Sequence, residues 1–301
     1  MDALSKRDLQ QYDIAFVGLG NMGVPMAAAL CADGYNLTVY DLNQDTVAQF
    51  AREHGAGTDP EALENADIVI LMLPNGTIVR DFLLAEDERT GSFASRMKPG
   101  AVVIDMSSSA PNGTHNLGEA MAPFGIDVID APVSGGVSRA RTGKLAIMTG
   151  GDEAVVARIR PLLESMSSSI THCGRLGSGH AMKALNNYVS AAGLVAACEA
   201  LRVAQHFGID GERAIEVLNS STGRNNSTEN KLAQFVLPES YDSGFSLGLM
   251  RKDLAAAVEL AAEMKMDLPL GAHLLSIWQT GEATLGVDAD HTAIARLVRI
   301  D

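Results

Sequence analysis

A glycine-rich turn near the start of the sequence has the spacing of a dinucleotide site. It consists of Gly18, Leu19, Gly20, Asn21, Met22 and Gly23, and it lies between the apolar run DIAFV and a helical pattern. Glycines at these positions allow a tight turn and let the backbone approach a pyrophosphate, whose charge is then met by N–H groups at the helix start. This setting favours a dinucleotide site over an ordinary glycine-rich turn.

An acidic residue further along indicates which dinucleotide is bound. Asp41 closes the second apolar run, NLTVYD. A carboxylate there can accept hydrogen bonds from the adenosine ribose, and it would repel the 2′-phosphate of NADP. Leu42 and Asn43 provide no arginine to offset that repulsion. The sequence therefore predicts NAD as the cofactor and NADP as the less favoured alternative. The other interpretation of Asp41, a surface aspartate that merely ends a strand, is less favoured at this spacing.

Two further segments carry groups that could handle a hydroxy acid. Ser134, Gly135 and Gly136 place a hydroxyl beside two unhindered backbone amides, an arrangement that suits a carboxylate. Lys183 and Asn187 are four residues apart in a helical pattern and share a face. A lysine in a partly desolvated pocket can exchange a proton with an alcohol during hydride transfer. Taken singly, the segment Ser134–Gly136 is more simply an ordinary turn, and Lys183 is more simply a solvated lysine on a helix.

The elements that must position these groups fall into two classes. From Tyr12 to about Thr171, short β-branched runs alternate with helical segments, which is typical of a parallel sheet covered by helices. Beyond Gly174, alanine-rich segments follow without a comparable strand signal. One of them, residues 180–208, would span about 43 Å as a single helix. We expect an α/β domain over 1–174 and an all-helical domain over 175–301, with no structure predicted for 220–244.

Composition and charge limit the possible partners. Hydrophobic residues make up 47% of the chain, enough for a substantial core. The net charge of −14 argues against a nucleic-acid surface, which needs clustered Lys and Arg. An anionic substrate must therefore meet a local positive group, since the whole-molecule field would repel it.

The cysteines and histidines predict neither a disulfide framework nor a metal site. Three widely spaced cysteines form no CxxC pair and indicate a reducing compartment, and no HxxH or HExxH pair occurs. His172, His180 and His206 are expected on a helix surface or a domain seam. The polar N-terminal stretch lacks the apolar core of a signal peptide or anchor, and the longest apolar runs are too short to cross a bilayer, so we expect a cytoplasmic protein with no membrane partner.

Six motifs in order resemble the 3-hydroxyisobutyrate dehydrogenase family, the β-hydroxyacid dehydrogenases, which are related to 6-phosphogluconate dehydrogenase. They are GLGNMG at 18–23, MLP at 72–74, DMSS at 105–108, DAPVSGG at 130–136, GSGHAMKALNN at 177–187 and MRKDL at 250–254. The resemblance spans nearly the whole chain. It implies an N-terminal Rossmann-type domain with a mostly parallel sheet that binds NAD, and a C-terminal all-helical domain for substrate binding and oligomerisation, joined by a long interdomain helix.

The resemblance also implies roles for individual residues. Lys183 matches the catalytic acid/base, Asn187 helps to hold the substrate, and Ser134, Gly135 and Gly136 bind its carboxylate. The substrate hydroxyl would give its proton to Lys183 as hydride moves to nicotinamide C4.

Four more residues match positions that contact the cofactor in the family. These are Leu73, Pro74, Ser108 and Lys252. Ser108 stands where many relatives have a threonine, and it keeps the hydroxyl.

The substrate is expected to be a short 3-hydroxy carboxylate of the 3-hydroxyisobutyrate type or its semialdehyde. Alternatives within the family are tartronate semialdehyde (2-hydroxy-3-oxopropionate) reductase and threonate-type dehydrogenases, and the choice would depend on side chains such as Arg224, Asn225, Asn226 and Phe245. A non-catalytic dinucleotide sensor is the alternative from another class, but the intact lysine and SGG turn speak against it. Alanine-rich helices with few charges predict a homodimer or homotetramer.

Overall fold

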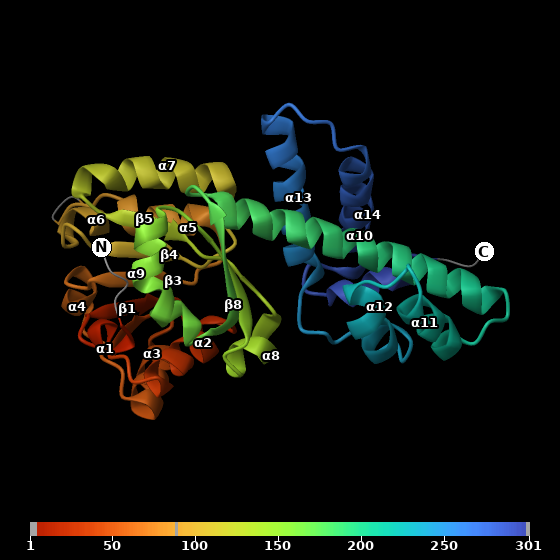
Figure 1. Cartoon of the computed structure of the whole chain (residues 1–301), viewed down its shortest axis with the longest axis horizontal. Helices are drawn as coiled ribbons and strands as arrows, with labels where there is room; N and C mark the ends of the chain where they lie inside the picture. Colours follow the sequence, from red (N-terminus) through yellow and green to blue (C-terminus); the bar gives the residue numbers. More distant parts are fainter. Residues whose placement is uncertain (1–4, 88–89, 299–301) are drawn as a thin grey trace. The chain divides into compact units, whose positions relative to one another are not determined.

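The chain divides into two compact units. In the computed structural model, which describes residues 5–87 and 90–298, the units are Met1–Lys183 and Ala184–Asp301 (Figure 1). Each unit has its own hydrophobic core. The two are described separately below.

The first unit is built on a mostly parallel sheet. Its strands are β1 Ile14–Val17, β2 Leu37–Tyr40, β3 Ile68–Leu71, β4 Val102–Asp105, β5 Asp127–Asp130, β6 Val133–Ser134, β7 Leu145–Gly150 and β8 Ser167–Gly174. The order is β2-β1-β3-β4-β5-β7-β6, and β8 pairs with β7 in parallel. Among these eight described strands, the pairs β5–β7 and β6–β7 are antiparallel and the other pairs are parallel. This confirms the predicted Rossmann-type sheet.

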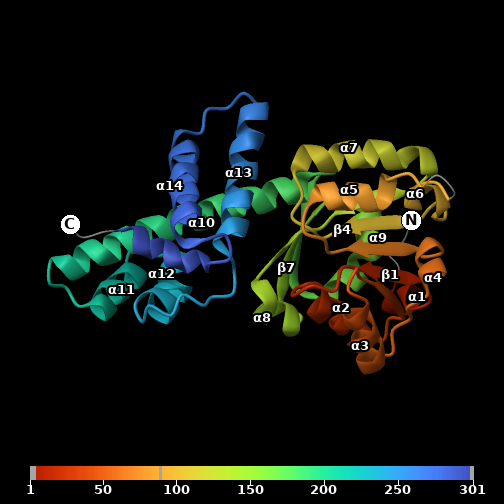
Figure 2. The same cartoon turned by 180° about the vertical axis from the view of Figure 1, so that it is seen from behind.

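Helices cover both faces of this sheet. They are α1 Lys6–Leu9, α2 Gly23–Ala32, α3 Gln44–His54, α4 Pro60–Glu64, α5 Gly76–Leu84, α6 Phe93–Arg96, α7 Pro111–Met121, η1 Ala122–Phe124, α8 Gly136–Arg141 and α9 Glu153–Glu164. Successive residues of β1 enter opposite cores: Phe16 packs with α2, α3 and α9, and Val17 packs with α5, α6 and α7. Figure 2 shows α2 and α3 on one side of the strands and α5 and α7 on the other.

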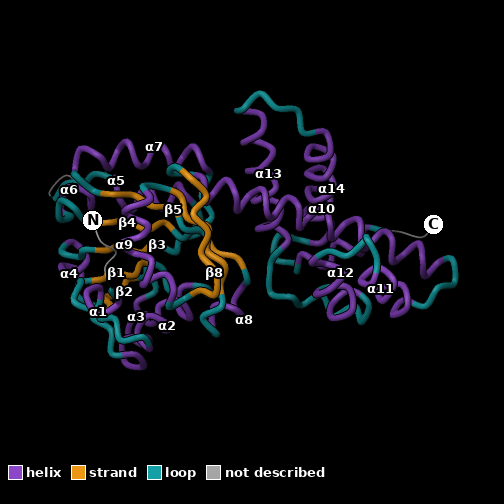
Figure 3. Tube along the Cα trace, viewed as in Figure 1, coloured by secondary structure: helices purple, strands orange, loops and turns teal. Residues whose placement is uncertain are grey.

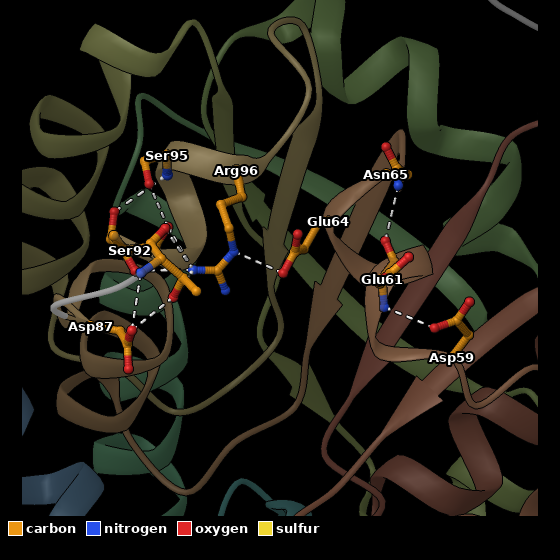
Figure 4. A network of polar contacts seen from close by, with 10 residues as sticks. Asp59, Glu61, Glu64, Asn65, Asp87, Ser92, Ser95 and Arg96 are labelled. Atoms are coloured by element: carbon orange, nitrogen blue, oxygen red, sulfur yellow. Dashed lines mark hydrogen bonds and ion pairs between the residues drawn. The ribbon is translucent and has the colours of Figure 1, made fainter.

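A polar network joins two short helices at the periphery of this unit. Arg96, in α6, donates from Nε to Glu64 at the end of α4 over 2.8 Å, and its Nη1 donates to the Gly91 carbonyl oxygen over 3.0 Å (Figure 4). Asp59 caps the start of α4 by accepting from the Glu61 amide. The network holds the segment before α6 against α4 and uses none of the predicted site residues.

The second unit consists of helices joined by loops, and no strand occurs among its described residues, 184–298, as Figure 3 shows by colour. Its helices are α10 Ser178–His206, which begins in the first unit, α11 Gly211–Ser220, α12 Asn226–Asn230, the π-helical turn η2 Leu232–Val236, α13 Leu247–Glu263, α14 Pro269–Leu285 and η3 His291–Leu297. They pack around the fully buried Trp278. The long helix is confirmed, and 220–244, for which no structure was predicted, contains α12 and η2. No helix among the residues described is both long and apolar enough for a membrane span.

Candidate active site

The glycine-rich turn connects β1 to α2, and two of its glycines are required by close packing. A Cβ at Gly18 would lie 2.2 Å from the Met72 carbonyl oxygen, and one at Gly23 would lie 1.8 Å from the Gly18 carbonyl oxygen. Gly20 is exposed and has nothing within 4 Å of its Cβ position. The turn therefore has tight glycines at its ends and an open backbone between them, which fits the approach of a pyrophosphate.

The Asp41 carboxylate, just after β2, lies against this turn. Its Oδ2 accepts a hydrogen bond from the Leu19 amide over 2.7 Å, and its Oδ1 accepts from the Asn43 amide over 2.8 Å. Asp41 is half-buried, so it keeps access to solvent. The structure thus brings Asp41 and the glycine-rich turn together, at the carboxyl ends of the first two parallel strands.

The segments after β3 and β4 meet at the same edge of the sheet. The Leu73 amide donates to Ser107 Oγ over 3.0 Å, and the Ser107 amide donates to Asp105 Oδ1 over 2.9 Å. Leu73 also reaches the first turn, since its Cδ2 lies 3.2 Å from the Cβ position of Gly18. Open parallel sheets bind ligands outside the carboxyl ends of their strands. Leu73, Pro74 and Ser108 come from these two segments.

Asp130, at the end of β5, fixes the start of α10. Its buried Oδ1 accepts from the Gly177 amide over 2.8 Å, and Oδ2 accepts from the His180 amide over 2.7 Å. A Cβ at Gly179 would lie 2.3 Å from the Met148 carbonyl oxygen, so only glycine allows α10 to begin this close to β7. The helix start is therefore held rigidly, and Lys183 follows one turn later, half-buried.

His180 does not lie on a helix surface, which was one of the two places expected for it, the other being a domain seam. Its ring is buried, with Nδ1 2.8 Å from Thr114 Oγ1 and Nε2 3.0 Å from the Ser107 carbonyl oxygen. Because that carbonyl oxygen can only accept, Nε2 carries the proton. The ring thus joins α7, the segment after β4 and α10. His206 is exposed at the end of α10, and His172 is exposed on strand β8.

We expect His180→Ala to destabilise the first unit by about 3 kcal/mol, because it leaves a cavity and removes partners from the Ser107 carbonyl and the Thr114 hydroxyl. Thermal melts of the purified protein would measure this. His180→Gln, whose amide can donate to Ser107, should recover part of the loss. His206→Ala is the matched control, and equal melting temperatures for the two alanine variants would contradict the structural role of the buried ring.

The SGG turn combines a half-buried hydroxyl with two exposed glycines. Ser134 ends β6, and Gly135 and Gly136 have φ values of +131° and +67°. Residues other than glycine rarely adopt either of these φ values, so the turn depends on its two glycines. The Arg139 side chain lies beside Gly135, with its Cδ 2.7 Å from the Cβ position of that glycine, and nothing lies within 4 Å of the Cβ position of Gly136. An exposed glycine turn of this kind can bind an anion through its amides.

In the second unit, Asn187 is paired with the KDL segment. Its buried amide Nδ2 donates to Asp253 Oδ2 over 2.5 Å, and its Oδ1 accepts from Asn186. Lys252 precedes Asp253 in α13 and is half-buried. The structure thus holds Asn187 next to α13 through Asp253, a pairing that the sequence patterns do not indicate.

Residues that were considered for substrate choice have local structural contacts. Asn225 caps α12 by accepting from the Ser227 amide over 2.7 Å. Arg224 forms an exposed ion pair with Glu229, and Phe245 packs edge-on against His291.

Comparison with known proteins gives matches over nearly the whole chain. Residues 13–174 match the family described as the NAD binding domain of 6-phosphogluconate dehydrogenase. Residues 177–298 match the family described as NAD-binding of NADP-dependent 3-hydroxyisobutyrate dehydrogenase. The two matches together cover both units.

Individual relatives agree with these matches. The 3-hydroxyisobutyrate dehydrogenase of Pseudomonas aeruginosa is 37% identical over 86% of this chain and 89% of its own length. The 2-(hydroxymethyl)glutarate dehydrogenase of Eubacterium barkeri is 34% identical over 90% of this chain and 89% of its own. A solved structure of Mycobacterium tuberculosis 3-hydroxyisobutyrate dehydrogenase with L-serine superposes with a TM-score of 0.85 at 33% identity, covering 96% of this chain and 99% of that one.

These relatives are hydroxy-acid dehydrogenases, and the matched families bind a nicotinamide dinucleotide. The chain therefore belongs to the 3-hydroxyisobutyrate dehydrogenase family, which is related to 6-phosphogluconate dehydrogenase and whose members are oxidoreductases acting on CH–OH groups with NAD or NADP.

Proposed function

We propose that this protein is an NAD-preferring dehydrogenase of a short 3-hydroxy carboxylate, with 3-hydroxyisobutyrate as the leading candidate, or of the corresponding semialdehyde in the reverse direction. The observation that carries the proposal is the anchoring of α10. Asp130 and His180 fix its first turn inside the first unit, and Lys183 follows directly. A fixed backbone is what an acid/base group needs to meet a substrate hydroxyl in one geometry.

The first unit has the features that a dinucleotide requires. Gly20 leaves the backbone of the turn open, and Asp41 lies beside it with both oxygens on backbone amides. When bound, NAD supplies a hydride acceptor at nicotinamide C4. We assign the turn at 18–23 together with Asp41, Leu73, Pro74, Ser108 and Lys252 to holding it.

The chain's own residues would then bind the acid and move one proton. Ser134 and the amides of Gly135 and Gly136 hold the carboxylate, and Asn187 helps to orient the substrate. Lys183 Nζ accepts the hydroxyl proton while the C–H bond of the same carbon breaks and its electron pair leaves as hydride, so that the alcohol becomes a carbonyl. In the reverse direction Lys183 returns the proton to the carbonyl oxygen.

The test is an initial-rate assay at 340 nm with NAD and with NADP. The panel contains 3-hydroxyisobutyrate, glycerate, threonate, 3-hydroxypropionate and serine. NADH formation with one of them would establish the reaction, the cofactor and the substrate together. Absence of turnover despite tight NADH binding would overturn the proposal in favour of a dinucleotide-binding protein without this activity.

We further propose that the second unit mediates assembly into a homodimer or homotetramer. Apolar side chains along and just after α10 are exposed, including Val189, Val203 and Phe207 at 66%, 67% and 84%. An apolar surface that is exposed on one chain can be buried when a second copy of the chain binds. Sedimentation at micromolar concentration should give two or four times the chain mass of 31.7 kDa. A single species at the mass of one chain would refute the assembly.

A further inference from the structure

Arg139 is an exposed cation that lies directly against the SGG turn. It stands in α8 four residues after Gly135, and helix side chains tilt toward the start of their helix, so its stem folds back over the turn. The Cβ position of Gly135 lies 2.9 Å from Arg139 Cβ, 3.2 Å from Cγ and 2.7 Å from Cδ. Among the residues that the structure describes, no carboxylate oxygen lies within 4.0 Å of the guanidinium. Its N–H donors are therefore available to a ligand beside the turn.

The surroundings of Arg139 are positive in a chain that is strongly negative overall. Residues 131–151 contain three cations, Arg139, Arg141 and Lys144, and no Asp or Glu, whereas the whole chain has a net charge of −14. Helix α8 packs against α2 and β7, and neither of these elements carries an acidic residue (Figure 2). An anion that approaches the SGG turn therefore meets local positive charge, which the field of the whole molecule does not supply.

Lys183 cannot supply this charge while it acts as the base. An amine accepts a proton only in its uncharged form, so at the start of alcohol oxidation the proposed base contributes no positive charge to the substrate carboxylate. Lys252 is assigned to the cofactor. The carboxylate therefore needs another cation, and a guanidinium suits it because the two groups can form two parallel hydrogen bonds.

Strand β7 connects the SGG turn to the start of α10 within the first unit. Ser134 pairs with Ala146 in β7, and the Met148 carbonyl oxygen, two residues further along that strand, lies against Gly179. Two residues of a strand span about 7 Å. The turn proposed for the carboxylate and the helical turn that precedes Lys183 are thus held by neighbouring stretches of one strand.

We propose that Arg139 is a specificity-determining residue of the substrate site, whose guanidinium binds the substrate carboxylate together with Ser134 and the amides of Gly135 and Gly136. This rests on the proposed function, which assigns the SGG turn to the carboxylate. Arg139 would favour acids over neutral alcohols of the same shape. It would act on substrate binding and hardly on turnover, since the carboxylate carries the same charge in the ground state and the transition state.

The test compares an acid with its neutral amide in variants of one helix. Arg139→Met keeps a flexible stem over Gly135 and removes the charge. Arg141→Met is the matched control, because Arg141 is also exposed and stands two residues further on, on a different face of α8.

With 3-hydroxyisobutyrate and saturating NAD, KM should rise about 10- to 100-fold in Arg139→Met, the loss expected for a charged hydrogen bond, and kcat should change by less than about threefold. With 3-hydroxyisobutyramide, kcat/KM should change by less than about threefold, since the amide carries no charge to bind. Arg139→Lys keeps the charge without the planar fork, so its KM for the acid should fall between those of the wild type and Arg139→Met.

Three results would overturn the proposal. Similar losses with the acid and the amide would mean that Arg139 only supports the turn, and an unchanged KM for the acid would remove it from the site. A weaker affinity for NADH in Arg139→Met would place the guanidinium at the cofactor instead.

Calorimetric titration in the presence of NADH keeps the test independent of turnover. Isobutyrate should bind the wild type about 10- to 100-fold more tightly than Arg139→Met, and isobutyramide should not distinguish the two proteins. If no 3-hydroxy acid is oxidised, the proposed function fails. Equal binding of isobutyrate to the two proteins, or binding to neither, would instead overturn the role of Arg139.

Discussion

Lys183→Ala is expected to lower kcat by about 10³-fold while NADH still binds with nearly unchanged affinity. General acid–base catalysis by a positioned side chain contributes 10²- to 10⁴-fold, and the alanine variant has no group to take the hydroxyl proton. The backbone should not move, because the start of α10 is held by Asp130 and His180, neither of which is changed. Initial rates at 340 nm and a fluorescence titration with NADH measure the two quantities.

Two controls separate catalysis from structure. Lys144→Ala removes an exposed lysine before β7 and should leave kcat unchanged. Small primary amines added to Lys183→Ala should restore part of the turnover, since they can supply the missing base, and should not affect the wild type. Near-normal turnover in Lys183→Ala would refute its role, and a parallel loss of NADH binding would indicate a structural effect.

Much of the fold could be predicted because strands and helices leave hydrophobic patterns among residues that are close together in the sequence. The central parallel strands are short buried runs, and β1, β3 and β4 are buried at every position, as expected for strands covered on both faces. The 29-residue helix was visible from its length and alanine content, and α10 spans Ser178–His206. Such signals need no knowledge of distant residues.

The helix α14 was not singled out because of two glycines that weaken its helical signal. Gly271 and Gly281 are needed for close packing, since their Cβ positions lie 2.6 Å from Leu268 Cδ2 and 2.7 Å from Ile294 Cδ1. The structure of 220–244 was missed for a related reason. Its polar residues have tertiary roles, such as the cap that Asn225 provides for α12.

The side chains that support the candidate site were missed because their partners lie far away in the sequence. His180 meets Thr114 and Ser107, which precede it by 66 and 73 residues. Asn187 meets Asp253, 66 residues later. Hydrophobic periodicity reports which face of a helix is apolar, and it cannot show that a polar side chain is buried against a specific partner. Motif order located the residues proposed for chemistry, and the structure shows what holds the segments that carry them.

The Asp41 carboxylate is expected to set the preference for NAD, and Asp41→Asn isolates its charge. Alanine at this position would also remove the acceptor for the Leu19 amide, and so loosen the turn, whereas asparagine keeps an oxygen for that bond. Repulsion between the carboxylate and a 2′-phosphate should cost about 2 kcal/mol at this half-exposed site. The ratio of kcat/KM for NAD over NADP should therefore fall about 30-fold.

Adding Leu42→Arg should carry the change further and make NADP the better cofactor. Leu42 follows Asp41 and is 88% exposed, so an arginine there requires no repacking and can pair with the 2′-phosphate. The NADP preference of the variant should weaken as the salt concentration is raised, because the loss of repulsion by Asp41 and the attraction by the new arginine are both electrostatic effects. Asp45→Asn, an exposed acid in the first turn of α3, is the matched control and should not change the ratio. If the ratio in Asp41→Asn equals that of the wild type, Asp41 does not face the adenosine ribose, and the NAD preference must come from another part of the chain.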